Sequence, residues 1–262
     1  MCYKEKLEEM YRKEYSCDGK CICFSKCSKD IPNGAEINCS RLKIGENYDN
    51  PEHPKIMFVG KEGVSKCYEI GAPAKVSEVH NPHYVGTFHT LAYILDKINC
   101  KDFVNESIIN EEHLKQFDDL SSEFCLTNYF KCAFKKNLES SNHNVATNKE
   151  MEKYCPHILT NEINILRPDI IIVQGKFSTS DFWGNKNGTL ETVCEHTETL
   201  YKSDDYNISV DKYHYLDNGK NLYIIWGYHP CAYGRIWFKS LDRFKEAINK
   251  VKDDYKKSIQ IC

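Results

Sequence analysis

The chain has 262 residues, of which 41% are hydrophobic and 28% are charged, and its formal net charge is −3. These values are typical of one globular domain with a sizeable core, and they exclude a chain that is basic as a whole. No apolar run reaches the roughly 20 residues of a membrane span, so we expect no membrane partner. The charged start argues against a signal peptide, and we expect a cytoplasmic monomer with a single domain over residues 1–262.

The amino-terminal part, residues 1–50, combines a short charged helix over residues 3–15 with a Cys-rich loop over residues 17–39. Fourteen cysteines are unusual for a cytosolic protein, where thiols stay reduced, so metal binding is a better first interpretation than disulfides. The loop contains Cys-x3-Cys twice, and Cys132 and Cys155 flank a later polar insertion. Such thiolates suit structural zinc or an iron–sulfur cluster, and unligated cysteines are the alternative.

Four apolar segments of strand length follow, and segments with helical spacing lie between them. Because the runs are almost continuously apolar, we expect strands that are covered on both faces, as in a parallel sheet. The sequence therefore predicts a three-layer α/β sandwich with a central four-stranded parallel sheet, plus the N-terminal Cys-rich loop. A long loop with a hairpin is expected over residues 178–221. The predicted strands are 55–60, 123–130, 169–175 and 222–228, and the predicted helices are 86–98, 148–166 and 238–257.

Polar or glycine residues stand at the ends of three of these strands. The first strand runs into Gly60 and Glu62, the second ends near Asn128, and the last stops at His229 before a proline. In open α/β sheets, ligands bind at the carboxyl ends of the strands. Tyr84 lies at the mouth of a predicted helix. Each of these residues is more often structural than functional when it is taken alone.

Together, the segments FVGKEG, NPHYVGTFHTLAYIL, LTNYFKC, KYCPHILTNEINILRPDIIIVQGK and YHPC form an ordered series. This series resembles the uracil-DNA glycosylase superfamily, and it is most similar to the iron–sulfur-containing family 4 branch. The resemblance covers roughly residues 17–240. It implies a DNA glycosylase that hydrolyses the N-glycosidic bond of uracil, or of a related deaminated base, in single- or double-stranded DNA.

The resemblance also implies roles for individual residues. Tyr84 corresponds to the aromatic residue that stacks on the flipped base, Asn128 to the amide that reads the uracil edge, and His229 to a catalytic histidine. Glu62, or water held by the backbone from Gly60 onward, corresponds to the part of the site that supplies the nucleophile. The residues that correspond to the ligands of a 4Fe–4S cluster are Cys23, Cys27, Cys132 and Cys155.

Some residues depart from the family pattern. Lys61 stands where the family has an acidic residue, Cys231 replaces a serine, and an insertion separates Cys132 from Cys155. The segment 231–237 corresponds to a loop that enters the minor groove. Because the whole chain is slightly acidic, contacts with DNA must come from local cations. The candidate cations are Lys131, Lys135, Lys136, Arg235 and Lys239.

Two other functions remain open at the level of sequence. Lys61 favours a catalytically inactive module of the same fold that binds nucleic acid or a modified base. The cysteines alone also fit a zinc-stabilised α/β protein of unrelated function. Excision activity would distinguish the first alternative, and metal content would distinguish the second.

Overall fold

The structure is a computed structural model of the chain, and it describes most of the sequence outside the Cys-rich loop. Cys23 and Cys27 therefore lie outside the described residues. The described residues are 2–15, 37–62, 70–79, 82–106, 109–135, 145–146, 151, 155–175, 190–230 and 234–260. Of these, the backbone alone is described at 37–39, 61–62, 132–135, 145–146, 234–235 and 260.

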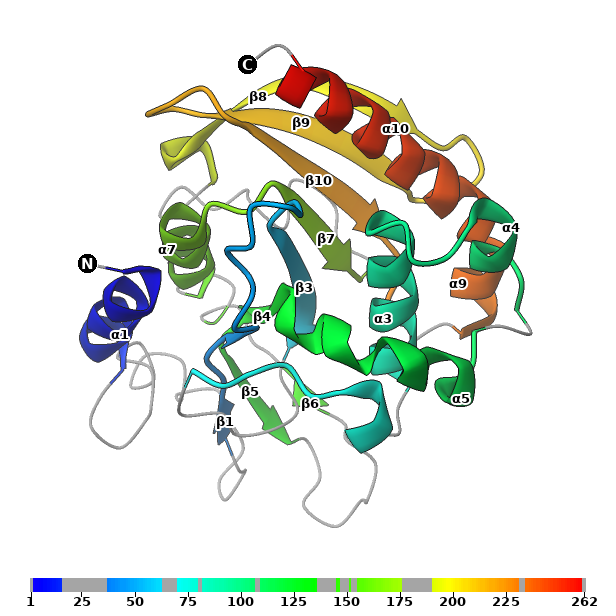
Figure 1. Cartoon of the computed structure of the whole chain (residues 1–262). Helices are drawn as coiled ribbons and strands as arrows, with labels where there is room; N and C mark the ends of the chain where they lie inside the picture. The colour runs from blue at the N-terminus through cyan, green and yellow to red at the C-terminus, as the bar shows by residue number, and fades with distance from the viewer. Residues whose placement is uncertain are drawn as a thin grey trace.

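The fold is an α/β sandwich built on a seven-stranded, mostly parallel sheet with the order β2-β4-β3-β7-β10-β9-β8 (Figure 1). Its four central strands, β4, β3, β7 and β10, are parallel to one another, which confirms the predicted four-stranded core. Antiparallel strands extend both edges. The strands are β2 (Lys43–Ile44), β3 (Ile56–Glu62), β4 (Phe124–Phe130), β7 (Ile170–Gln174), β8 (Cys194–Lys202), β9 (Ser209–Tyr215) and β10 (Asn221–Gly227).

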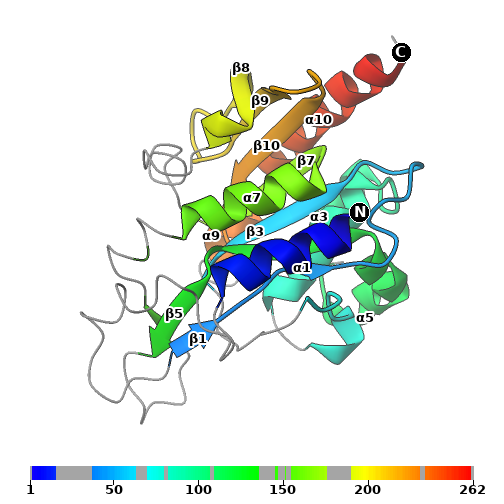
Figure 2. The ribbon, with the colours of Figure 1, turned by 90° about the vertical axis from the view of Figure 1, so that its left-hand side faces the viewer.

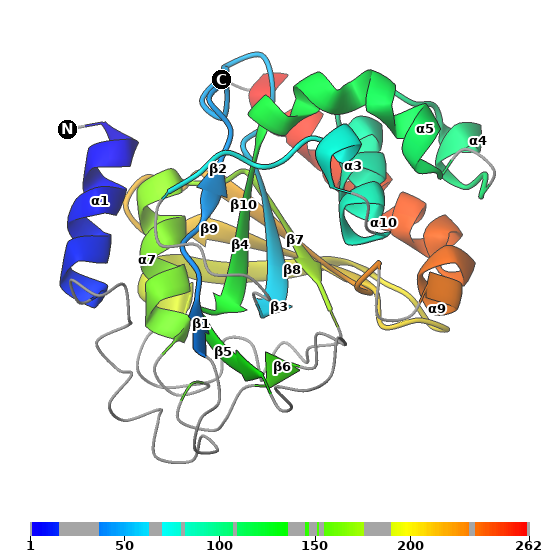
Figure 3. The same ribbon diagram turned by 90° about the horizontal axis from the view of Figure 1, so that it is seen from below.

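The segment 178–221 contains the predicted hairpin, but its described part is more regular than a long loop. Strands β8 and β9 form this hairpin, and β9 pairs with β10 so that the hairpin widens the central sheet. Strand β9 is buried on both faces, because Val210 belongs to one hydrophobic cluster whereas Tyr213 and Tyr215 belong to the other. A second sheet has the order β1-β5-β6 and lies beyond the ends of β3 and β4 (Figure 3). Its strands are β1 (Ile37–Cys39), β5 (Cys132–Lys135) and β6 (Val145–Ala146).

Helices cover both faces of the central sheet. Helices α1 (Tyr3–Glu14) and α7 (Pro156–Leu166) lie side by side on one face (Figure 2). We call this the α7 face, and the opposite one the α3 face after α3 (Pro82–Ile94). A hydrophobic cluster fills the space on each face, so the sheet is buried between two layers. The other helices on the α3 face are α4 (Cys100–Phe103), α5 (Glu111–Leu114), α9 (Gly234–Lys239), α10 (Leu241–Gln260) and the 3-10 segments η2 (Val76–Glu78) and η3 (Lys115–Ser122), while η4 (Leu190–Thr192) precedes β8.

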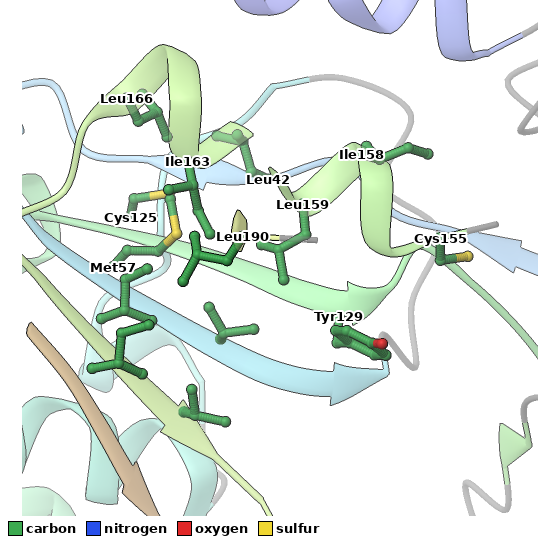
Figure 4. Packing of buried hydrophobic residues seen from close by; sticks show 14 of the residues in the cluster. Leu42, Met57, Cys125, Tyr129, Cys155, Ile158, Leu159, Ile163, Leu166 and Leu190 are labelled. Carbon is green, nitrogen blue, oxygen red and sulfur yellow. The ribbon is translucent and has the colours of Figure 1, made fainter. Parts of the chain in front are cut away.

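Helix α7 begins later than the predicted helix over residues 148–166. Pro156 occupies its first turn, where the missing N–H costs nothing, and Cys155 is the N-cap residue rather than a residue inside the helix. The helix ends at Leu166 as expected, because Pro168 follows. Figure 4 shows Leu159 and Ile163 pointing from α7 into the apolar cluster, with Cys155 at the start of the helix.

The two other predicted helices are also shifted or divided. Helix α3 begins at Pro82 and ends at Ile94, because Asp96 adopts a left-handed conformation with a φ of 57°. The predicted tail helix over 238–257 is divided into α9 and α10 at Ser240, whose hydroxyl donates to the carbonyl oxygen of Trp237. Among the described helices, none has the length and apolar character needed to cross a membrane.

Candidate active site

Four residues at the carboxyl ends of the parallel strands form one row across the sheet. Asn128 in β4 lies opposite Gly60 in β3, Gly60 lies opposite Gln174 in β7, and Gln174 lies opposite Gly227 in β10. Since neighbouring strands are about 4.8 Å apart, the backbones of Asn128 and Gln174 are separated by roughly 10 Å. We call these four residues the strand-end row, and Figure 3 shows the arrowheads that mark the carboxyl ends of β3, β4 and β7.

The strand-end row faces α3. Phe58 and Ile172, two residues before Gly60 and Gln174, belong to the hydrophobic cluster of the α3 face, and side chains alternate along a strand. Gln174 also contacts α3 directly, because its Nε2 donates to Thr87 Oγ1 over 2.9 Å. Two carboxamides and two glycines therefore alternate on the face that α3 covers.

The absence of a side chain at Gly60 leaves room for the Asn128 carboxamide, which lies above it. A Cβ added to Gly60 would be only 2.8 Å from Asn128 Oδ1, closer than real Cβ contacts. The Asn128 side chain would have to move to make room. The sequence singled out both residues as base-binding candidates, and the fold places them in direct contact.

The first turn of α3 brings two aromatic rings to the same region. The rings of His83 and Tyr84 meet edge to face at 5.8 Å, and Tyr84 stacks on Phe88 with ring centroids 6.5 Å apart. Tyr84 is 8% exposed, so most of its ring is already packed in the α3-face cluster. Tyr84 thus has a structural role in the core as well as a position beside the strand ends.

His229 follows β10 and stacks on His83, with ring centroids 4.6 Å apart and an interplanar angle of 24°. Burial and the neighbouring His83 ring together lower the pKa of His229 to about 4. Burial also lowers the pKa of His83, and the hydrogen bond from its Nε2 to Gln174 Oε1 partly offsets this effect. At neutral pH both imidazoles are therefore uncharged, and each has one N–H to donate.

Close packing holds the His229 corner against α3. A Cβ added to Gly86 would lie 2.4 Å from Pro230 Cβ and 2.5 Å from Pro230 Cγ. Any side chain at position 86 would therefore push the corner away from the helix. Gly86 explains why a glycine closely follows Tyr84 in this fold.

These contacts bring together residues from segments far apart in the sequence. The model of the uracil-DNA glycosylase superfamily matches residues 46–252, a stretch that contains the four parallel strands, α3 and α7. The chain belongs to the uracil-DNA glycosylase superfamily. No curated protein sequence matches the chain. The superfamily resemblance seen in the sequence motifs is thereby confirmed, and it indicates a DNA glycosylase-like protein that acts on DNA.

Several candidate site residues predicted from the sequence have side chains that the structure does not describe. Glu62 is the last residue of β3 and pairs with Phe130, but its side chain and that of Lys61 are outside the description. The same holds for the side chains of Lys135 and Arg235. Lys136 and Cys231 lie outside the described residues altogether.

The prediction that Lys131 contacts DNA is wrong. Its side chain is 0% exposed, and its Nζ donates to Glu162 Oε2 over 2.7 Å. Thr127 Oγ1 donates to the same carboxylate oxygen over 2.8 Å, and the Tyr11 hydroxyl donates to the other oxygen. A cation at the end of a strand looked like a surface residue because its partner lies 31 residues away in α7. Lys239 is exposed at the end of α9 and remains a candidate for contacts with DNA.

Two of the four predicted cluster ligands can be placed. Cys132 begins β5, and Cys155 is buried at the N-cap of α7. The backbone register puts Cys39 directly opposite Cys132. Among the described side chains, no three His, Cys, Asp or Glu residues form a group that could hold a metal ion, and of the predicted ligands only Cys155 has a described side chain.

His83, Thr87 and Gln174 were not among the residues that the sequence singled out. Gln174 carried a usable signal, because it is the polar residue that ends the apolar run DIIIVQ, as Asn128 does near the end of its own strand. His83 carried a weaker signal as the neighbour of Tyr84. Its contact with His229 depends on the packing of α3 against the end of β10.

Proposed function

We propose that this chain hydrolyses the N-glycosidic bond of uracil, or of a related deaminated base, in DNA. The observation that supports this activity most strongly is the strand-end row, in which Asn128 and Gly60 lie on the face where His83 of α3 stacks on His229, which follows β10. Base excision requires an amide that reads a planar base and a donor for the leaving group. Asn128 would supply the amide, and His229 would supply the donor.

The target base must leave the duplex before it can reach this edge. Flipping costs a few kcal/mol and is easiest for mispaired or unpaired nucleotides. As the bond between the base and deoxyribose C1′ breaks, the sugar becomes cationic and the base becomes anionic. The neutral His229 imidazole would donate a hydrogen bond to the oxygen on which the negative charge develops.

Asn128 would select the base. Its carboxamide offers one acceptor and two donors, which match the edge of uracil, whereas the amino group of cytosine would leave a donor facing a donor. Gly60 lets the base approach the strand backbone closely, because no side chain stands there. Tyr84 would contact the base with its aromatic ring, and the stacking of a base on an aromatic side chain contributes about 1–3 kcal/mol.

The nucleophile is a water molecule in this proposal. Glu62, or the backbone that follows Gly60, would hold this water and stabilise the sugar cation. Hydrolysis places the hydroxyl of the water on C1′, and its proton neutralises the departing base. The products are an abasic site and a free base.

We further propose that the chain belongs to the iron–sulfur branch and holds a 4Fe–4S cluster, with structural zinc as the alternative. Cys132, Cys155 and two cysteines of the N-terminal loop, Cys23 and Cys27, would be its ligands and would tie the loop to the domain. Cα atoms of opposed residues in antiparallel strands are about 4.5–5.5 Å apart, so the pairing of Cys39 with Cys132 supports Cys39 as a further candidate.

Metal analysis tests the cluster independently of activity. Iron and sulfide content, with visible absorption recorded without oxygen, should show iron, and Cys155→Ser should lower it. Cys100→Ser is the matched control, because Cys100 is exposed on the α3 face. A colourless protein that contains zinc would contradict the iron–sulfur assignment and leave the glycosylase proposal standing.

The proposed partner is uracil-containing DNA, bound by a cytoplasmic monomer. Of the candidate cations, Lys239 has a described side chain that lies on the surface. Because phosphate contacts release counterions, affinity should fall steeply as salt rises.

Single-turnover assays test the activity. Micromolar protein is incubated with single- and double-stranded oligonucleotides that contain one uracil, and abasic sites are scored after alkaline cleavage. We expect excision by the unaltered chain, and a rate about 10²–10³ lower for His229→Gln. The absence of abasic product with retained DNA binding would instead favour the inactive binding module.

A further inference from the structure

The ring of His83 stacks on the ring of His229, and hydrogen bonds also fix the position of the His83 ring. Its Nε2 is 2.7 Å from Gln174 Oε1, and Gln174 Nε2 donates to Thr87 Oγ1 over 2.9 Å. Thr87 Oγ1 in turn donates over 2.8 Å to the backbone carbonyl of His83. These three hydrogen bonds form a closed loop that begins and ends on His83.

The direction of each hydrogen bond in this loop follows from the previous one. The Thr87 hydroxyl uses its single proton for the His83 carbonyl, so it can only accept from Gln174. Gln174 must therefore present its NH2 group to Thr87 and its oxygen to His83. Since that oxygen only accepts, His83 Nε2 carries the proton, and Nδ1 of the neutral ring does not.

The loop is anchored on rigid and buried parts of the fold. Thr87 lies in the second turn of α3, and Gln174 ends β7 at the centre of the sheet. Both side chains are buried, so breaking either bond would leave a polar group without a partner. The plane of the His83 ring is thus fixed by two elements at once.

We propose that His83 is a positioning residue for His229: the closed hydrogen-bond loop fixes the plane of the His83 ring, and this ring fixes the plane of the His229 imidazole by stacking. The catalytic consequence rests on the proposed function, because His229 must aim its N–H at the leaving base. The structural consequence does not. His83 should control the environment of His229 whether or not the chain cleaves DNA.

Titration of the two rings by NMR tests the structural consequence. His83→Phe keeps a flat ring but removes a group that can become charged, so the pKa of His229 should rise. His89→Phe is the matched control. His89 lies in the same helix, is buried and stacks on Phe103, and its substitution should leave the titration of His229 unchanged.

Two further variants complete the test. One avoids an unsatisfied buried group that could cause misfolding, and the other measures the effect on catalysis. In His83→Phe/Gln174→Leu the buried partners are removed together, so no carboxamide is left unsatisfied. In Gln174→Leu the His83 ring stays but is no longer held. We expect single-turnover excision to fall about 10- to 100-fold in Gln174→Leu.

The outcomes separate this inference from the proposed function. An equal His229 titration in His83→Phe, the double variant and the unaltered chain would overturn the positioning role. An altered titration in a chain that never releases uracil would support the positioning role and refute the activity. Full excision by Gln174→Leu would show that the loop has no catalytic effect.

Discussion

Two polar clusters lie on opposite faces of the sheet near the end of β4, and they differ in charge and in access. On the α7 face, Lys131 and Glu162 form an ion pair that is 0% exposed and is completed by Thr127 and Tyr11. On the α3 face, the strand-end row meets His83 and His229, which are neutral and only partly buried.

The two clusters share a strand. Thr127 and Asn128 are neighbours in β4, and because side chains alternate, Thr127 serves the α7 face and Asn128 the α3 face. The α7 cluster ties the end of β4 to α7 through the Lys131–Glu162 ion pair and to α1 through the Tyr11 hydroxyl. The α3 cluster links β7 to α3 through uncharged hydrogen-bonding groups. One strand end thus combines a fixed anchor with a candidate site.

The largest effect is expected from breaking the anchor. Lys131→Met leaves Glu162 buried without its cation, and the loss of one partner of a buried ion pair costs about 3–5 kcal/mol. Urea unfolding should show this loss, and adding Glu162→Gln should recover much of it. Lys115→Met, which removes a cation from a surface pair, is the control and should leave the midpoint nearly unchanged. An unchanged midpoint for Lys131→Met would contradict the anchor role.

The α3 face should make the fold sensitive to acid. Burial lowers the pKa of His89 to about 4, against about 6.5 in an unfolded chain. Between these values the unfolded state binds a proton that the folded state excludes, so stability is complete above pH 6.5 and falls toward pH 4. His89 alone should account for about 3 kcal/mol of this loss.

The variant His89→Phe removes this titration. Its free energy of unfolding should therefore depend less on pH between 6.5 and 4 than that of the unaltered chain. The two proteins are compared by the slope of the free energy of unfolding against pH, and not by its absolute value. The reason is that Phe also leaves the Phe103 carbonyl without its donor at every pH. Parallel pH curves for the two proteins would show that His89 is charged or exposed in solution.

A smaller effect is expected from Gly60→Ala in the strand-end row. The added methyl group would displace the Asn128 carboxamide, which is the mobile end of a side chain, so the fold should survive. Excision should fall about 10- to 100-fold, because a misplacement of about 1 Å is enough for such a loss. Gly71→Ala is the control, since nothing lies within 4 Å of the added Cβ. Equal rates for both variants would remove Asn128 from the site.

The sequence predicted one of these clusters far better than the other. The apolar runs and the polar residues at their ends located the parallel strands, Asn128 and His229, because strand ends meet at one edge whatever the details of packing. The pairing of Lys131 with Glu162 and the stacking of His83 on His229 depend on how α7 and α3 pack on the sheet. No local pattern encodes such contacts, and Lys131 was therefore assigned to the wrong environment.

The helix boundaries show the same division. Helix α7 ended before Pro168 as expected, because a proline restricts the backbone of the residues next to it in sequence. Helical spacing alone placed the start of that helix too early and the start of α3 too late. Pro156 and Pro82 stand in the first turns of the two observed helices. These local signals were present in the sequence and outweigh apolar periodicity.

The base choice of Asn128→Asp tests the central claim most directly, since the claim is that the strand-end row reads an everted base. Single-turnover excision is measured on matched oligonucleotides that contain uracil or cytosine at one position. The unaltered chain should release uracil and leave cytosine intact. In the Asn128→Asp variant, the new carboxylate can accept a hydrogen bond from the cytosine amino group, so cytosine should also be released. An active Asn128→Asp protein with unchanged preference for uracil would contradict the claim.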